Sequence, residues 1–335
     1  MPELPSVKPL IRENPFKPPV FPSPMIWTGS AVKMFRKCKR KFFWKYIMRL
    51  RPRSGGSAAL FLGSAFHDSL AKWYERKRAD MSKIAFEQCK GLEQKIFTHG
   101  KLYDEEEFDK LQTGLETLTG MLTAYAELYS ADRGAWRNVR TEQEFQVDLG
   151  SFIFRGKLDL LGKDKDGDFF AEHKTASSID ESYIDRLPLD TQVRGYIYGA
   201  LFGAHTPIRR VLYNVTRKSK LRRKQSESAS EFNQRIKDDY AARPDFYFYR
   251  EMLMFSKDDI ANFQLELNQT HKEYQAIVDS IRDSKDPRSW LPNDTVCNEF
   301  FKTCPYHNLC VNGMDASSKL LYEQGETMHE ELSDE

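Results

Sequence analysis

The sequence lacks the features that would place it in a membrane or outside the cell. Its 335 residues contain no run of 18 apolar residues, and the N-terminus has no hydrophobic signal segment. We therefore expect a soluble cytoplasmic protein with no membrane partner. Cysteine is also scarce, because five cysteines in a chain of this length, without an export signal, do not indicate a disulfide framework.

The chain has little net charge. Lysine and arginine together number 51 against 49 acidic residues, which gives a net charge of +2, so any affinity for nucleic acid must come from local clusters. Ten basic residues and no acidic one lie between Lys33 and Arg53, interleaved with aromatic residues. This mixture predicts a phosphate-tracking groove in which Trp44 and its neighbours stack on bases. An ordinary amphipathic helix whose basic side chains reach water is the alternative.

A second basic cluster has six lysines and arginines between Arg217 and Lys224. It lies in a polar segment, residues 217–244, that we interpret as a basic insertion between two strands. Charge runs of this kind are usually solvated, and contact with DNA is the other interpretation.

Apolar periodicity predicts both helices and strands. Helices are expected at residues 30–50, with Ser30 as the N-cap, and at 63–74, 108–129, 190–202 and 260–281, and strands at 141–149, 209–216 and 245–255. Residues 1–24 hold eight of the 15 prolines and are expected to form an extended or disordered arm. Residues 315–335 carry seven acids and one lysine and are expected to be a disordered tail. We expect residues 25–314, between these two segments, to form one domain.

The stretch from Ser151 to Thr175 predicts a β-hairpin, because apolar and polar residues alternate on both sides of a polar turn. With Asp166-Gly167 as a two-residue turn, Asp159 pairs with Lys174. Side-chain parity then puts Asp159, Glu172 and Lys174 on one face. Two carboxylates and an ammonium suit a hard divalent cation beside a proton-handling group. A solvated hairpin face is the alternative.

Two helices add polar residues that need an explanation. Gln192 and Tyr196 lie one turn apart on one face, where they could orient a phosphate or a lysine, or form the polar rim of a packed helix. His67 opens a helix with an aromatic side, where a histidine is either a hydrogen-bonded structural residue or a metal ligand.

Taken in order, Gly156-x-x-Asp159, Glu172-x-Lys174 and Gln192-x-x-x-Tyr196 resemble the active-site series of the PD-(D/E)XK nuclease superfamily, in particular its RecB-like branch. The resemblance implies a restriction-endonuclease-like mixed β-sheet flanked by helices. It also implies a metal-dependent DNA nuclease, with Gln192 and Tyr196 supporting the scissile phosphate and Lys174. Gly63-x-x-x-His67 matches a further step of this branch. The implied Mg²⁺ or Mn²⁺ ligands are His67, Asp159, Glu172 and the main-chain carbonyl of His173.

The cysteines have an informative spacing. Cys297, Cys304 and Cys310 are clustered, whereas Cys38 lies far upstream, so a metal centre could join the N- and C-terminal segments. This arrangement resembles the iron–sulfur staple of RecB-like nucleases, including CRISPR-associated exonucleases, and implies a [4Fe-4S] cluster. Six residues separate Cys297 from Cys304, where the relatives commonly have two. Tetrahedral Zn²⁺ therefore stays open, with four thiolates or with His307 in place of one. Cys89 is the spare thiol.

The resemblance finally implies an exonuclease that acts on single-stranded DNA or DNA ends in recombination, repair or replication, with other proteins of these processes among its expected partners. Two alternatives belong to other classes. One is a non-catalytic DNA-binding protein that retains the nuclease fold, and the other is a zinc-stapled interaction protein.

Overall fold

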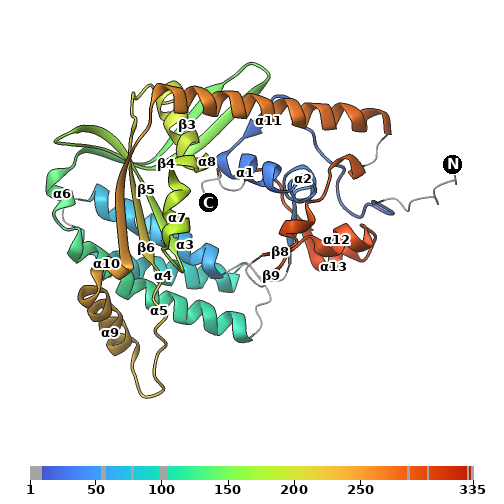
Figure 1. Cartoon of the computed structure of the whole chain (residues 1–335). Coiled ribbons are helices and arrows are strands. Elements are labelled where there is room, and N and C mark those ends of the chain that lie inside the picture. The colour runs from blue at the N-terminus through green and yellow to red at the C-terminus, as the bar shows by residue number, and fades with distance from the viewer. Residues whose placement is uncertain are drawn as a thin grey trace. The chain divides into compact units, whose positions relative to one another are not determined.

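The computed structural model describes residues 10–53, 58–76, 79–98, 105–284, 287–299, 302–329 and 332. The chain divides into two compact units. Unit 1 comprises Met1–Arg53, Gln146–Gly156 and Ile260–Glu335, and unit 2 comprises Ser54–Phe145 and Lys157–Asp259. Each unit has its own layers of helix and strand (Figure 1).

Within the described ranges, six strands form the main sheet in the order β1-β4-β5-β6-β7, with β3 paired to β4. The sheet is mixed, because β1 and β4 run parallel, as do β5 and β6, whereas β4–β5 and β6–β7 are antiparallel. The strands are β1 (Met25–Trp27), β3 (Arg137–Asp148), β4 (Phe152–Asp164), β5 (Gly167–Ala176), β6 (Arg210–Arg217) and β7 (Phe248–Met254). The expected mixed sheet with flanking helices is confirmed.

The helices of unit 2 cover its strands. They are α3 (Ala58–Glu75), α4 (Met81–Thr98), α5 (Glu105–Leu128), α6 (Asp132–Ala135), α7 (Glu181–Asp185), α8 (Thr191–Phe202), α9 (Ala229–Ala242) and α10 (Pro244–Tyr247), with a 3-10 turn at Leu187–Leu189. Apolar residues of α3, α4, α5 and α9 pack with Leu160 of β4 and with Phe169 and Ala171 of β5 in one core. Side chains that alternate with these on β5 therefore point to the opposite face of the sheet.

Helix α8 packs against that opposite face. Asp190 caps it by accepting hydrogen bonds from the main-chain amides of Gln192 and Val193. Gly199 permits a close approach to β3, because a Cβ at this position would lie 2.2 Å from Cε2 of Phe145. The contact fixes how deeply α8 sits on the sheet.

Unit 1 is organised around aromatic rings. Trp27, Phe35, Phe42, Tyr274 and Trp290 are buried together, and Phe42 stacks on Trp290 with the ring centroids 5.9 Å apart. The elements around this cluster are α1 (Gly29–Lys37), α2 (Lys39–Phe42), a π-helix (Phe43–Ile47), β2 (Leu50–Pro52), α11 (Lys257–Ser284), 3-10 turns at Pro287–Ser289 and Asp294–Val296, β8 (Asn298–Glu299), β9 (Lys302–Thr303), α12 (His307–Asn312), α13 (Ser318–Leu321) and β10 (Tyr322–Gln324).

The prediction of one helix over residues 30–50 is wrong. Thr28, not Ser30, caps α1, and Cys38 is extended, with φ −158° and ψ 108°, so the helix ends before it. The prediction that aromatic residues of this stretch stack on bases is also wrong, because Phe42, Phe43, Trp44 and Tyr46 are all at most 1% exposed. Their rings serve the core of unit 1, and bases cannot reach them.

The predicted hairpin exists, but its register differs. Asp164 pairs with Gly167 and Leu160 with Ala171, so the two-residue turn is Lys165-Asp166. The Asp164 carboxylate accepts a hydrogen bond from the Asp166 amide, and Gly167, with φ 124°, begins the returning strand. If the register continues, Asp159 stands opposite Glu172, and the predicted pairing with Lys174 is wrong.

Three segments outside the predicted domain core also take part in ordered contacts. Residues 10–24 reach other parts of unit 1 through main-chain hydrogen bonds, such as that from Arg12 to the carbonyl of Met314. Part of residues 315–335, expected to be disordered, forms α13 and β10, which pairs with β2. The 217–244 segment contains α9. No helix in the described part of the chain has the length and apolarity needed to cross a membrane.

Candidate active site

The candidate site lies on one face of β4 and β5 in unit 2. Glu172 and Lys174 alternate with Ala171 and His173 along β5, so they point away from the core that Ala171 joins. Asp159 precedes Leu160, the first residue of β4 that pairs with β5, and its carboxylate accepts a hydrogen bond of 2.9 Å from the main-chain amide of His173. That bond joins the two strands where the acids project.

Two helices complete the site. From α3, Nδ1 of His67 lies 3.2 Å from Oδ2 of Asp159. From α8, Oε1 of Gln192 accepts a hydrogen bond of 3.2 Å from Nζ of Lys174, and its Nε2 donates one of 2.7 Å to the hydroxyl of Tyr196. Lys174 also forms an ion pair with Glu172. The structure thus brings all the predicted side chains into one connected group, apart from that of His173.

The ionisation of the group follows from burial and from its neighbours. Burial raises the pKa of Glu172 to about 7, although Lys174 opposes this shift. Burial lowers the pKa of Lys174, but the carboxylates of Glu172 and Asp159 raise it by more, so the net pKa is raised and the ammonium persists. In the same way, His67 outweighs burial at Asp159 and lowers its pKa, while Asp159 raises the pKa of His67. The two acids and the two basic side chains therefore shift one another's pKa values.

His173 faces the opposite side of β5 and belongs to a buried polar network. Its Nδ1 lies 2.7 Å from Nδ2 of Asn214 on β6, and the same amide nitrogen donates a hydrogen bond of 2.6 Å to the hydroxyl of Tyr125. Nε of Arg250 donates a hydrogen bond to the amide oxygen of Asn214, and the Arg250 guanidinium pairs with Asp132 at 2.8 Å. Burial lowers the pKa of His173 to about 3, so its ring is neutral. The side chain fixes the strand, and only its main-chain carbonyl is left as a candidate metal ligand.

The donor set can be compared with what a divalent cation requires. The carboxylate of Glu172 is fully buried, and neither oxygen receives a hydrogen bond from the described residues. A buried carboxylate of this kind needs a cation, and Lys174 is the one in contact. Carboxylate and main-chain carbonyl oxygens, such as those of Asp159, Glu172 and His173, suit Mg²⁺ or Mn²⁺. Among the residues that the structure describes, however, no three His, Cys, Asp or Glu side chains stand in ligating arrangement.

The four cysteines singled out from the sequence all lie in unit 1. Cys38 separates α1 from α2, Cys297 and Cys304 flank the β8–β9 pair, and Cys310 lies in α12. The amide of Cys304 donates a hydrogen bond of 2.7 Å to the carbonyl of Cys297. Burial, with smaller contributions from the thiols of Cys304 and Cys38, raises the pKa of Cys310 to about 11, although Trp44 and Arg40 oppose the shift. The thiols are therefore near one another, although they too lack a ligating arrangement within the described residues.

Cys89 belongs to unit 2 instead. All five cysteines are free thiols. The Cys89 sulfur, in α4, lies 3.6 Å from the carbonyl of Leu115 and 3.8 Å from the hydroxyl of Thr119, both in α5. Its contacts are those of helix packing.

Sequence reasoning missed the residues that support the site from behind. Asn214 is 1% exposed in the middle of the apolar strand β6, and a lone amide in such a run is a signal that could have been read. Arg250 on β7 gave no comparable signal. Glu142 was missed as well: it pairs with Lys157 at 2.7 Å, and Asp159 and His67 contribute to the shift of its pKa.

The chain is an α/β protein with a mixed sheet flanked by helices. It carries a compact polar site with one acid on β4 and an acid and a lysine on β5. The model of the PD-(D/E)XK nuclease superfamily matches residues 27–311, which is most of the chain. The chain therefore belongs to the PD-(D/E)XK nuclease superfamily, and this membership points to a nuclease whose substrate is DNA. A comparison with curated proteins gave no match.

Proposed function

We propose that this chain is a metal-dependent deoxyribonuclease that hydrolyses phosphodiester bonds at the site of unit 2. The observation that carries the proposal is the group formed by Asp159, Glu172 and Lys174, in which the buried Glu172 carboxylate has the Lys174 ammonium as its only ion-pair partner among the described residues. A superfamily of nucleases with this residue series makes hydrolysis the chemistry that fits best.

In this proposal Asp159 and Glu172, with His67 and the carbonyl of His173, hold Mg²⁺ or Mn²⁺. The bound ion would supply a water of lowered pKa and would neutralise charge on the phosphate. Lys174 keeps its proton and donates to the attacking water or to a phosphate oxygen. Gln192 receives a hydrogen bond from Lys174 and donates one to Tyr196, so it orients the ammonium.

The test separates cleavage from binding. Asp159→Ala, Glu172→Ala and Lys174→Ala should each lower the cleavage rate in Mn²⁺ by at least about 10²-fold, the scale for removing one transition-state contact. Binding of DNA in EDTA should stay close to that of the wild type. Wild-type cleavage by the Asp159 variant would overturn the site, and a wild-type protein that binds DNA but never cleaves it would favour the non-catalytic alternative.

For the mode of action we propose an exonuclease on single-stranded DNA or DNA ends. This rests on the resemblance to RecB-like relatives, since the buried Trp44 takes no part in threading a strand. Linear and covalently closed single-stranded DNA of one sequence should be compared at equal concentration. Cleavage of the circle as fast as the linear strand would require reclassification as an endonuclease.

For unit 1 we propose a [4Fe-4S] cluster on Cys38, Cys297, Cys304 and Cys310. Support comes from four thiols placed close together on separate segments, the donor number that both a cluster and structural zinc require. Protein purified without oxygen should contain iron and acid-labile sulfide. Cys304→Ser should lose the chromophore, and Cys89→Ser, the matched control, should keep it. Stoichiometric zinc without iron would favour the zinc staple.

A further inference from the structure

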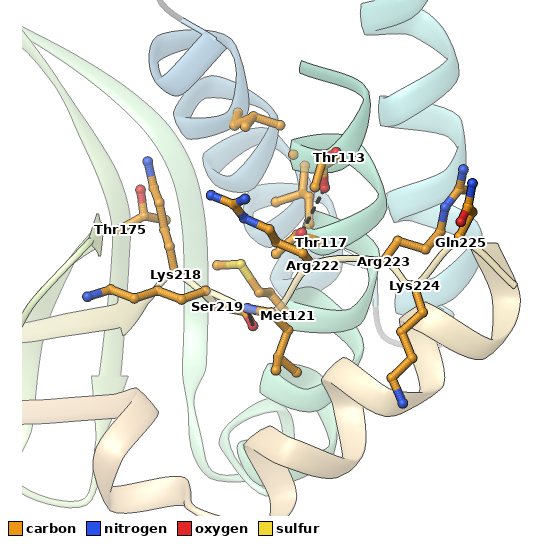
Figure 2. A pocket seen from close by; sticks show the side chains of 15 residues that line it. Thr113, Thr117, Met121, Thr175, Lys218, Ser219, Arg222, Arg223, Lys224 and Gln225 are labelled. Atoms are coloured by element: carbon orange, nitrogen blue, oxygen red, sulfur yellow. Dashed lines mark hydrogen bonds between the residues drawn. The ribbon is translucent and has the colours of Figure 1, made fainter. Parts of the chain in front are cut away.

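Unit 2 has a second concave surface that the proposed catalytic group does not use. It is a pocket of about 970 Å³ between α5 and the loop that leaves β6. Figure 2 shows Arg222, Arg223 and Lys224 on this loop beside the helix that carries Thr113 and Thr117. The residues that line the pocket include five lysines and arginines and no acid: they are Leu62, Thr113, Gly114, Thr117, Leu118, Met121, Thr175, Lys218, Ser219, Lys220, Leu221, Arg222, Arg223, Lys224 and Gln225.

The loop is held in a defined shape, so the pocket is a built feature. The amide of Lys218 donates a hydrogen bond of 2.8 Å to the carbonyl of Ala176 at the end of β5. Arg223 pairs with Glu116 of α5 at 2.7 Å. Farther on, Glu227 accepts hydrogen bonds from the Lys224 amide and from the guanidinium of Arg235.

Three of the five cations have no counter-ion among the described residues. Arg223 pairs with Glu116 and Lys224 interacts electrostatically with Glu227, but Lys218, Lys220 and Arg222 form no ion pair with a described residue. Lys218 is half-buried, and burial lowers its pKa, which means that its charge would gain from a nearby anion. Like charges this close repel one another, so an anionic ligand would stabilise the loop as well as bind to it.

The floor of the pocket indicates more than a phosphate. The apolar part of the lining comes from the half-buried Leu62 and Leu221, which pack against the buried core residues Leu118 and Met121. A duplex keeps its bases stacked inside and would offer only phosphates to such a site. A single strand can offer phosphates to the rim and the flat face of a base to the floor.

The pocket shares two elements with the catalytic group. Thr175, which lines it, follows Lys174 on β5, although strand alternation turns the two side chains to opposite faces of the sheet. Leu62, which also lines it, precedes His67 by five residues of α3, a rise of about 7.5 Å along the helix.

We propose that this pocket binds the sugar-phosphate backbone of a single DNA strand and holds one of its bases against the apolar part of the lining. The proposal rests on the proposed nuclease function for the identity of its ligand. Lys218, Lys220, Arg222 and Lys224 contact successive phosphates, and Leu221 contacts the base.

The test is equilibrium binding of a labelled single-stranded oligonucleotide in EDTA, over a range of salt concentrations, with the full chain. The variant Lys220→Ala/Arg222→Ala/Lys224→Ala should bind at least about tenfold more weakly. Its slope of log affinity against log salt should be shallower by about 2, since each lost phosphate contact with a single strand removes about 0.7. All three residues are exposed, so folding should be unaffected, which thermal unfolding checks.

The matched control is Lys163→Ala/Lys165→Ala. These exposed lysines lie at the β4–β5 turn, at the opposite end of β5 from Thr175, and their loss should leave affinity and slope unchanged. An equal loss in the control and the triple variant would overturn the pocket in favour of diffuse charge. So would wild-type binding by the triple variant.

Two further ligands test the base contact. Duplex DNA and an abasic single strand should bind the wild type more weakly than the intact strand, and Leu221→Ala should remove the advantage over the abasic strand. Equal affinity for all three ligands would overturn the single-strand assignment. The two proposals can fail separately. If the triple variant loses binding but the wild type never cleaves DNA in Mn²⁺, the binding pocket stands and the nuclease function fails. If the wild type cleaves DNA but the triple variant binds normally, the nuclease function stands and the binding pocket fails.

Discussion

The substitution Gly199→Ala should disable the candidate site without unfolding the protein. A Cβ at residue 199 would lie 2.2 Å from Cε2 of Phe145 and 2.4 Å from its Cζ. Carbon atoms pack at about 3.5 Å or more, so the ring or the helix must move by more than about 1 Å. The ring has little room, because Phe145 is 4% exposed and lies edge-on to Tyr196, with centroids 6.0 Å apart.

The two consequences differ in size. Overpacking costs about 1–3 kcal/mol, and the higher helix propensity of alanine returns up to about 1 kcal/mol, so the free energy of unfolding should fall by about 1–2 kcal/mol. The same shift moves Gln192 and Tyr196, and with them the hydrogen bond of 3.2 Å that orients Lys174. A displacement of about 1 Å can cost about 10²-fold in rate, so the loss of cleavage should exceed the loss of stability.

The assays are urea unfolding and cleavage of linear single-stranded DNA in Mn²⁺. Gly91→Ala in α4 is the matched control, because a Cβ there meets nothing within 4 Å, and it should be neutral or stabilising with full activity. Phe145→Leu should relieve the clash, so that the double variant is more stable and more active than the sum of the single effects, with a coupling of about 0.5–3 kcal/mol. If Gly199→Ala behaves like the control, or the two changes are additive, this account of α8 is refuted.

Three further outcomes are expected. Asn214→Leu removes the core partner of Nδ1 of His173 and of Nε of Arg250, while the Tyr125 hydroxyl keeps Tyr74 and Arg250, and urea unfolding should show a loss of about 2–4 kcal/mol. Arg210 holds the pKa of Asp164 below its usual value, so the ion pair stabilises the fold above about pH 4. This stabilisation is lost as the pH falls through the folded-state pKa of Asp164. Asp164→Asn should therefore be less stable than the wild type at pH 7 and equal to it at low pH. His67→Ala should need more Mn²⁺ for half-maximal cleavage and should be partly rescued by excess Mn²⁺, whereas an unchanged metal titration would remove His67 from the ligands.

The acidic face could be predicted although the hairpin register was wrong. The prediction paired Lys165 with Asp168, whereas the structure pairs Asp164 with Gly167. Each residue of β4 therefore faces a β5 residue two positions earlier in the sequence than predicted. A shift by two leaves side-chain parity unchanged, whereas a shift by one would have reversed it. Asp159 and Glu172 therefore share a face under both registers, and only the pairing of Asp159 with Lys174 fails.

The fate of the basic aromatic stretch could not be predicted from local pattern. Phe42 and Phe43 are buried because they pack on Trp290, which lies more than 200 positions away in the sequence, and no local period signals such a partner. The helix break at Cys38 was not predicted either. The Cys38 side chain accepts a hydrogen bond from the Lys41 amide and so caps the start of α2. One residue thus ends α1, caps α2 and presents a thiol to the other cysteines.

Strand β5 shows why the candidate site was partly visible in the sequence and partly hidden. Glu172 and Lys174 are polar residues in an apolar strand, and their type alone indicates function. His173 between them looks like a third member of the same set, but strand alternation turns it to the other face, where Asn214 and the residues bonded to it hold it. Because its main chain also donates to Asp159, this buried network sets the position of the acid on the neighbouring strand. The geometry of the candidate site therefore depends on polar residues on the other face of the sheet, whose partners come from β6, β7 and α5 and are identified only when the sheet is assembled.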